Sequence, residues 1–71
     1  MPTLKLYVRN LTERADERRL EQMLRALRGV YGVVASCDGR CLELDFEDDD
    51  VSIHHIIATV AAAGFDAQLV S

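Results

Sequence analysis

The chain has no tryptophan, only one proline and only two cysteines among its 71 residues. Two cysteines are too few for the disulfide framework that stabilises many small secreted domains. No stretch approaches the ~20 consecutive apolar residues that a membrane span needs, so we expect no direct membrane insertion. The N-terminus also lacks the charged start and apolar run of a secretion signal, which favours a cytoplasmic location.

The residues that are present indicate a small globular domain. Hydrophobic residues make up 49% of the chain and charged residues 28%, both near the average for soluble proteins. We expect one domain over residues 1–71, because the sequence contains no linker and no low-complexity tract. Since a chain of about 60 residues buries only about 60% of its unfolded surface, the expected core is thin.

The net charge of −4 is unevenly divided along the chain. Residues 1–37 hold seven basic and four acidic side chains, a balance of +3, whereas residues 38–71 hold one basic and eight acidic, a balance of −7. The acidic total argues against a nucleic-acid partner, which requires a basic face that displaces phosphate counterions. Two interpretations of the charge stay open, charge-steered docking of a protein partner and plain solvated faces. A monomer and a weak dimer also both stay open.

The first half of the chain predicts a strand followed by a helix. Apolar residues alternate with polar ones over residues 4–8, which is the period of a half-buried strand. Thr12 is the expected N-cap of the helix, and Gly29 its expected end. One helical face collects apolar residues at the i, i+3, i+4 and i+7 positions, namely Leu20, Met23, Leu24 and Leu27.

A β-hairpin follows the first helix. Asp38-Gly39 is a strong signal for a two-residue type I′ turn, because that turn needs positive φ at both central positions. With this turn, Ala35 lies opposite Leu42, and both point to the same face of the sheet. The third strand is then expected over Cys41–Phe46.

The second half of the chain repeats the order of helix and strand. An acidic loop over Glu47–Asp50 precedes Ser52, which is the expected cap of a second helix. The apolar stripe of this helix consists of Ile53, Ile56, Ile57 and Val60. Gly64 ends the helix, and residues 65–70 form a short last strand. The order βαββαβ predicts an α+β, ferredoxin-like sandwich, with two helices on one face of a four-stranded antiparallel sheet.

The order of motifs along the whole chain resembles that of the heavy-metal-associated family, which includes copper chaperones and the N-terminal domains of P-type metal ATPases. Leu11-Thr12 stands where that family has Met-Thr, Gly29-Val30 where it has Gly-Val, and Gly64-Phe65 where it has Gly-Tyr or Gly-Phe. In the family, a Gly-Met-Thr-Cys-x-x-Cys loop binds a soft ion, often Cu(I), through two thiolates. The resemblance implies the same fold and a role in metal transport.

This chain departs from the family pattern at the metal loop. Asn10 replaces the motif glycine, and Glu13 and Asp16 replace the two cysteines. Soft ions prefer thiolate ligands and hard ions prefer carboxylates, so the two acids cannot form a Cu(I) clamp. One interpretation is an accessory or regulatory domain of a heavy-metal transport or homeostasis system that acts by protein docking. The contact surface expected from this interpretation consists of Glu13, Arg14, Arg18 and Phe65.

The alternative is a metal-binding domain of altered selectivity. Glu13 and Asp16 would hold a divalent ion such as Zn²⁺, with help from Cys37 and Cys41 on the neighbouring hairpin. Strand alternation opposes that help, because it points Cys37 inward and Cys41 outward. The plainer interpretation is that the two acids stabilise a helix dipole, that Cys37 is a small buried hydrophobe and that Cys41 is an exposed thiol.

The remaining candidate residues carry less chemistry. His54 and His55 follow the acidic loop, and adjacent helical positions point about 100° apart, so they are poor joint ligands. Phe65 stands at the aromatic position that shields the family's metal loop, as a core residue or as a lid. We find no Ser/His/Asp order, no phosphate-binding glycine loop and no inward pair of acids, so we do not expect an enzyme.

Overall fold

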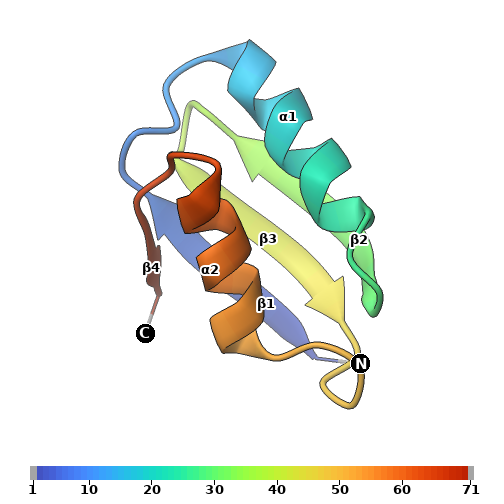
Figure 1. The fold of residues 1–71 in the computed structure, drawn as a ribbon. Coiled ribbons are helices and arrows are strands. Elements are labelled where there is room, and N and C mark those ends of the chain that lie inside the picture. Colours follow the sequence, from blue (N-terminus) through green and yellow to red (C-terminus); the bar gives the residue numbers. More distant parts are fainter. Residues whose placement is uncertain (1, 71) are drawn as a thin grey trace.

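The computed structural model describes residues 2–70, and its elements follow the predicted order (Figure 1). They are β1 (Thr3–Val8), α1 (Arg14–Arg25), β2 (Val30–Ser36), β3 (Cys41–Phe46), α2 (Ile53–Ala62) and β4 (Ala67–Leu69). The strands pair in the order β2-β3-β1-β4, and every pairing is antiparallel. Both helices cover one face of this sheet (Figure 1), so the predicted α+β, ferredoxin-like sandwich is confirmed.

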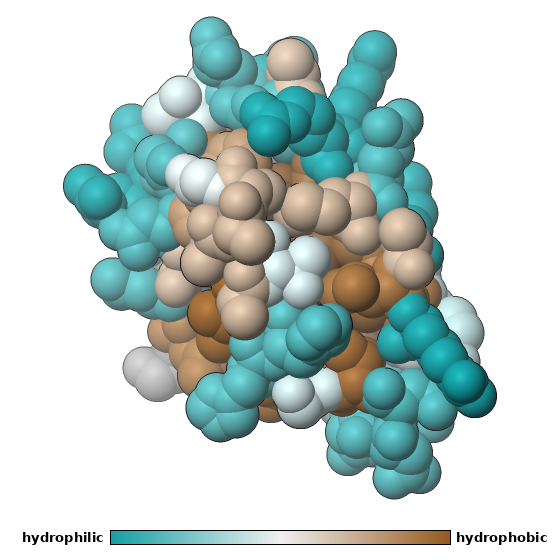
Figure 2. All heavy atoms as spheres, in the orientation of Figure 1, coloured by the Kyte–Doolittle hydropathy of each residue, from teal (hydrophilic) through white to brown (hydrophobic). Residues whose placement is uncertain are grey.

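The core lies between the sheet and the two helices. The inward residues of β1 are Leu4, Leu6 and Val8, as the alternation predicts, and all three are buried. The helix stripes supply Leu20, Leu24, Ile56 and Val60, which are fully buried. Hydrophobic surface gathers over α2 in the middle of the helix-bearing face, and hydrophilic side chains surround it (Figure 2).

The first helix begins and ends at other residues than predicted. Its N-cap is Glu13 rather than Thr12, and the Glu13 side chain makes no capping hydrogen bond. The main chain closes the first turn instead, since Asp16 N donates to Glu13 O over 3.1 Å. The helix ends at Arg25, before Gly29. Gly29 is needed for another reason: its φ is +92°, and a Cβ there would lie 2.7 Å from Asp50 Cβ.

The hairpin has the predicted register but a different turn. Ala35 pairs with Leu42, as expected, and the pairing of β2 with β3 ends at Ser36 and Cys41. Residues 37–40 therefore form a four-residue loop, in which the left-handed residue is Arg40, with φ of 51°. The type I′ prediction is wrong, because four residues connect the strands and neither Asp38 nor Gly39 has a positive φ. Arg40 O accepts a hydrogen bond from Val8 N over 2.7 Å, which continues the pairing of β3 with β1.

The outer edge of β2 is covered by side chains of α1. Three hydrogen bonds do this, namely Arg25 Nη2 to Val33 O (3.1 Å), Ala35 N to Glu21 Oε2 (3.1 Å) and Cys37 N to Glu17 Oε2 (2.7 Å). Glu17, Glu21 and Arg25 are spaced four residues apart, so they form one stripe along the helix. We call this stripe the edge cover. It satisfies backbone groups that a bare edge strand would leave open to other chains.

Candidate functional site

Three loops meet at one end of the domain, and we call this end the loop end. The loops are residues 9–13 between β1 and α1, residues 37–40 between β2 and β3, and residues 63–66 between α2 and β4. Arg14 Nη2 lies 3.6 Å from Asp38 Oδ2, which joins the start of α1 to the hairpin. The structure therefore brings the Glu13–Asp16 segment and the hairpin to the same end, as the topology predicts.

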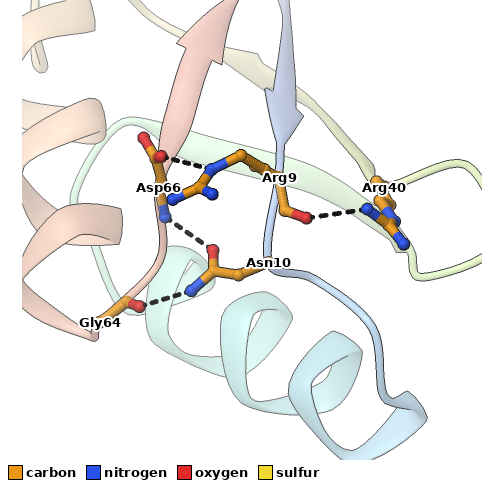
Figure 3. A network of polar contacts seen from close by, with 5 residues as sticks. All are labelled: Arg9, Asn10, Arg40, Gly64 and Asp66. Carbon is orange, nitrogen blue, oxygen red and sulfur yellow. Dashed lines mark hydrogen bonds and ion pairs between the residues drawn. The ribbon is translucent and has the colours of Figure 1, made fainter.

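Asn10, which the resemblance places at the motif glycine, joins the first and third of these loops (Figure 3). Its Nδ2 donates to Gly64 O over 2.9 Å, and its Oδ1 accepts from Asp66 N over 2.8 Å. We call this pair of bonds the Asn10 latch. Beside it, Arg9 Nε contacts Asp66 Oδ2 at 2.8 Å, and Arg40 Nη1 donates to Arg9 O over 3.4 Å (Figure 3). A glycine has no side chain to make the latch.

Glu13 and Asp16, which the resemblance places at the two motif cysteines, lie at the start of α1. Glu13 is exposed, whereas Asp16 is half-buried and its Oδ1 lies 3.4 Å from Arg19 Nη1. The Arg19 guanidinium in turn lies over the Phe65 ring, 5.7 Å from its centroid. Within residues 2–70, no group of three or more His, Cys, Asp or Glu side chains is arranged to hold a metal ion. A metal role for Glu13 and Asp16 stays a prediction.

Cys37 is held by Glu17, a residue that the sequence analysis did not select. Cys37 N donates to Glu17 Oε2 over 2.7 Å. The hydrogen bond between thiol and carboxylate, followed by burial, raises the pKa of Cys37, and the bonds from the Cys37 backbone N–H and thiol lower the pKa of Glu17. The thiolate is the form that binds soft metals, so this contact makes Cys37 a poorer ligand near neutral pH. The i, i+4, i+8 spacing of Glu17 with Glu21 and Arg25 is the sequence signal that could have revealed it.

Cys41 lies on the other side of the sheet from Cys37. Cys37 packs against the hydrophobic core, whereas Cys41 pairs across the strands with Ser36 and Tyr7, one residue before the inward Leu42. Both cysteines are free thiols and both are half-buried. The predicted divergence of the two side chains is therefore confirmed, and their joint use as ligands stays a prediction.

The predicted docking residues differ in their accessibility. The Arg14 side chain is 75% exposed and pairs with Glu17 at 3.7 Å in addition to Asp38. Arg18 is exposed, and no ion pair holds it within residues 2–70. Phe65 belongs to the core and is only 7% exposed, so a partner could reach no more than its edge. Of the two roles expected for Phe65, a core residue or a lid over the loop, this burial agrees with the first.

The two histidines lie at the start of α2, near the acidic loop. The predicted cap of this helix is confirmed, since Ser52 Oγ accepts a hydrogen bond from His55 N over 3.0 Å. His54 and His55 are both exposed. His54 lines a groove, described below, with residues of the acidic loop and β4.

Comparisons with known proteins support the fold. No family model matches the chain, and no curated protein matches it in sequence. Oxidized MerP from Ralstonia metallidurans CH34 superposes with a TM-score of 0.92 at 21% identity, over 99% of this chain and 97% of that one. A copper-binding domain from the P-type ATPase HMA7 gives 0.93 at 21% identity, over 100% and 96%.

A third solved structure with this fold is the Atx1–Cu(I)–Ccc2a complex. It gives a TM-score of 0.87 at 23% identity, over 97% of this chain and 94% of that one. Neither helix of residues 2–70 has the length and apolar character that crossing a bilayer requires. The chain therefore has the ferredoxin-like fold of heavy-metal-associated domains, as its sequence predicts.

Proposed function

We propose that this chain is an accessory or regulatory domain of a heavy-metal transport or homeostasis system, and that it acts by docking a protein partner at the loop end. The observation that carries the proposal is the chemistry of the loop end. Carboxylates, those of Glu13 and Asp16, stand where the resemblance places the two cysteines, and Arg19 already pairs with Asp16 at 3.4 Å. A loop that binds Cu(I) needs thiolates there, because a soft ion prefers sulfur ligands.

The loop end is also preorganised for contact with a protein. The Asn10 latch fixes the β1–α1 loop to the α2–β4 loop with bonds of 2.9 and 2.8 Å. A rigid surface loses less conformational entropy on binding than a mobile one. Glu13, Arg14 and Arg18 are exposed on this rigid frame, so charges of both signs face solvent. Such charges steer encounter and fix the orientation of a partner.

The partner that this surface fits is another domain of the same fold. The Atx1–Cu(I)–Ccc2a complex shows one such domain pairing with a partner, at 23% identity to this chain. In our proposal this chain keeps the docking surface of that kind of complex and has lost the metal clamp. It would then occupy or mask a partner without receiving its ion.

The test is an amide NMR titration of this protein with the Cys-x-x-Cys domains of this fold that its source organism encodes. We expect saturable shifts at residues 12–18 with at least one domain, in the presence or absence of Cu(I). The double variant Arg14→Glu, Arg18→Glu should weaken this binding at least five-fold, because reversed charges repel the same partner. Arg28→Glu is the matched control, since that side chain is 90% exposed beyond the other end of α1. Absence of shifts with every domain would sink the proposal.

A second candidate function is binding of a divalent ion such as Zn²⁺ at the loop end. The observation that favours it is the proximity of the hairpin to the start of α1, where Arg14 Nη2 lies 3.6 Å from Asp38 Oδ2, next to Cys37. Cys37 is therefore near the start of the helix that carries Glu13 and Asp16. A one-to-one Zn²⁺ effect that Glu13→Ala and Asp16→Ala abolish would establish this function. A Zn²⁺ titration without localised shifts would reject it and leave docking.

Under the docking proposal the domain acts in the cytoplasm, without catalysis and without a nucleic-acid partner. The net charge of −4 supports the absence of a nucleic-acid partner, because it disfavours binding to phosphate backbones. The relatives in fold are described as a copper-binding domain and as a complex with Cu(I), which are binding roles.

A further inference from the structure

The outer edge of β4 presents backbone groups that make no hydrogen bond within the described part of the chain, residues 2–70. The ladder with β1 uses Val70 N to Lys5 O (3.2 Å) and Arg9 N to Asp66 O (3.0 Å). Because antiparallel residues alternate between facing their neighbour and facing away, the N–H and C=O groups of Ala67 and Leu69 point outward. No side chain within residues 2–70 makes a hydrogen bond to them. The edge of β4 is thus open to another strand.

An apolar groove of about 520 Å³ runs beside this open edge. Its apolar lining comes from β3, α2, β4 and the segments just before β1 and α2, namely Pro2, Phe46, Val51, Ile53, Ile57 and Leu69. Ile53, predicted on the buried stripe of α2, is 36% exposed, and Leu69 is 56% exposed. Exposed large apolar side chains that line a hollow indicate a binding surface.

The rim of the groove carries one acidic residue, Asp48, beside the polar Ser52 and His54. Its neighbours Glu47 and Asp49 belong to the same acidic loop. Within residues 2–70, the ion pairs of this loop are limited to Asp50, which lies 3.9 Å from Arg28. The charge that complements this rim is therefore a lysine or arginine on the bound molecule.

We propose that the β4 edge and this groove bind an extended apolar segment of a partner protein that carries a lysine or arginine. The segment adds as a fifth strand beside β4, where its backbone pairs with Ala67 and Leu69. Strand addition of this kind draws affinity from main-chain bonds and specificity from pockets for alternate side chains. Here one apolar side chain fills the groove beside Leu69, and the basic residue meets Asp48. The edge cover on β2 blocks the other edge of the sheet, which directs the segment to β4.

This site lies away from the loop end, and it does not depend on the docking proposed there. The groove is lined by the acidic loop and by the start of α2, whereas the loop end consists of residues 9–13, 37–40 and 63–66. The two surfaces can be monitored separately through the amides of residues 12–18 and of residues 67–70. Failure at one surface therefore leaves the other untouched.

The test is an amide NMR titration with a blocked hexapeptide of sequence Lys-Thr-Val-Thr-Val-Thr, acetylated and amidated. In this probe the lysine and both valines share one strand face. We expect saturable shifts confined to residues 66–70 and 48–57. Two further peptides carry N-methyl groups, one on its odd-numbered residues and the other on its even-numbered residues. Only one of the two should lose binding, because only alternate peptide amides face β4.

Two protein variants test the contacts, and a third controls for exposure. Asp48→Asn should weaken binding of the lysine probe about two- to five-fold, the range expected of one exposed ion pair, and a probe with glutamate in place of lysine should bind more weakly to the unmodified protein. Leu69→Lys should weaken binding of the lysine probe about ten-fold or more, by removing the wall of the groove and adding a like charge. Val34→Lys should not, although Val34 is also apolar and is 66% exposed, because it lies on β2.

Several outcomes would overturn the proposal. They are the absence of saturable shifts, shifts centred on residues 30–36 of β2, and unchanged binding of both N-methylated peptides. Concentration-dependent shifts at residues 66–70 in the protein alone would assign the edge to a second copy of this chain instead of a partner peptide.

Discussion

The two outer strands of the sheet end it in opposite ways. At β2, Glu17, Glu21 and Arg25 of α1 bond three outward backbone groups at 2.7 to 3.1 Å. At β4, the neighbouring side chains of α2 that line the groove include Ile53 and Ile57, which cannot form hydrogen bonds. In this domain the edge of β2 is therefore closed by one stripe of α1 side chains. The helix that carries charged residues on that stripe closes its edge, and the helix that carries isoleucines leaves its edge open.

The largest expected effect is a difference in the free energy of unfolding lost by truncating a core residue near β2 and a residue of β4. Leu24 is fully buried under α1, on the β2 side, whereas Leu69 of β4 is 56% exposed. Leu24→Ala should lower the free energy of unfolding by about 2–5 kcal/mol, and Leu69→Ala by no more than about 0.5 kcal/mol. Urea denaturation of both variants measures this. Equal losses would show that β4 contributes more to the core than its exposure indicates.

A smaller effect is expected from opening the edge cover. Glu21 Oε2 accepts a hydrogen bond from Ala35 N over 3.1 Å, in a half-buried position. Glu21→Ala should therefore lower the free energy of unfolding by about 1 kcal/mol, and amide exchange at Ala35 should become faster. Glu43→Ala is the control, because that side chain lies exposed on the open face of the sheet. Unchanged exchange at Ala35 would contradict the covering role.

The Asn10 latch holds the start of β4, and its loss tests how β4 stays in place with one free edge. Asn10→Gly removes the side-chain bonds to Gly64 O and Asp66 N, at 2.9 and 2.8 Å. Because both bonds are exposed, we expect a loss of about 0.5–1 kcal/mol in the free energy of unfolding. Amide exchange at Asp66 should become faster while exchange at Ala35 stays unchanged. Faster exchange at both sites would mean that the two edges are coupled.

The sequence was sufficient for the fold because apolar periodicity decides it. The alternation of Leu4, Leu6 and Val8 and the helical spacing of Leu20 and Leu24 correctly predict which faces are buried. The register of the hairpin was also predictable. Directly paired residues share one face of the sheet, so the inward Ala35 had to pair with an inward residue such as Leu42.

The sequence was insufficient where a contact joins distant residues. Arg40 O accepts a hydrogen bond from Val8 N, 32 positions earlier, and the latch joins Asn10 to residues 54 and 56 positions later. The role of Glu17 likewise requires knowing that β2 lies beside α1. Local propensity contains no information about such partners.

The stability that Glu17 contributes to the edge cover of β2 should depend on pH. The hydrogen bonds from the Cys37 backbone N–H and thiol lower the pKa of Glu17 below its ordinary value of 4.5. A carboxylate with a lowered pKa in the folded state contributes stability that is present above the unfolded pKa and is lost as pH falls through the folded pKa. The stability difference between the unmodified protein and Glu17→Gln should therefore shrink as pH falls below about 4.5.

Urea denaturation of the two proteins at pH 7 and at several values below pH 4.5 measures this effect. Glu13→Gln is the matched control, because Glu13 is exposed and its side chain makes no capping bond. A stability difference for Glu17→Gln that does not vary with pH would show that the edge cover at Cys37 does not depend on the charge of Glu17.

The smallest expected effect concerns the ion pair at the start of β4. Arg9 Nε lies 2.8 Å from Asp66 Oδ2, but the two side chains are 67% and 45% exposed. Exposed ion pairs contribute about 0.2–1 kcal/mol and are screened by salt, so Arg9→Gln should cost that much at low salt and less at about 1 M salt. The Arg9 backbone N–H keeps its bond to Asp66 O at 3.0 Å in this variant, so β4 should stay paired with β1. Salt-dependent urea denaturation measures the loss. A loss of stability that does not change with salt would mean that the Arg9 side chain stabilises β4 by packing and not by its charge.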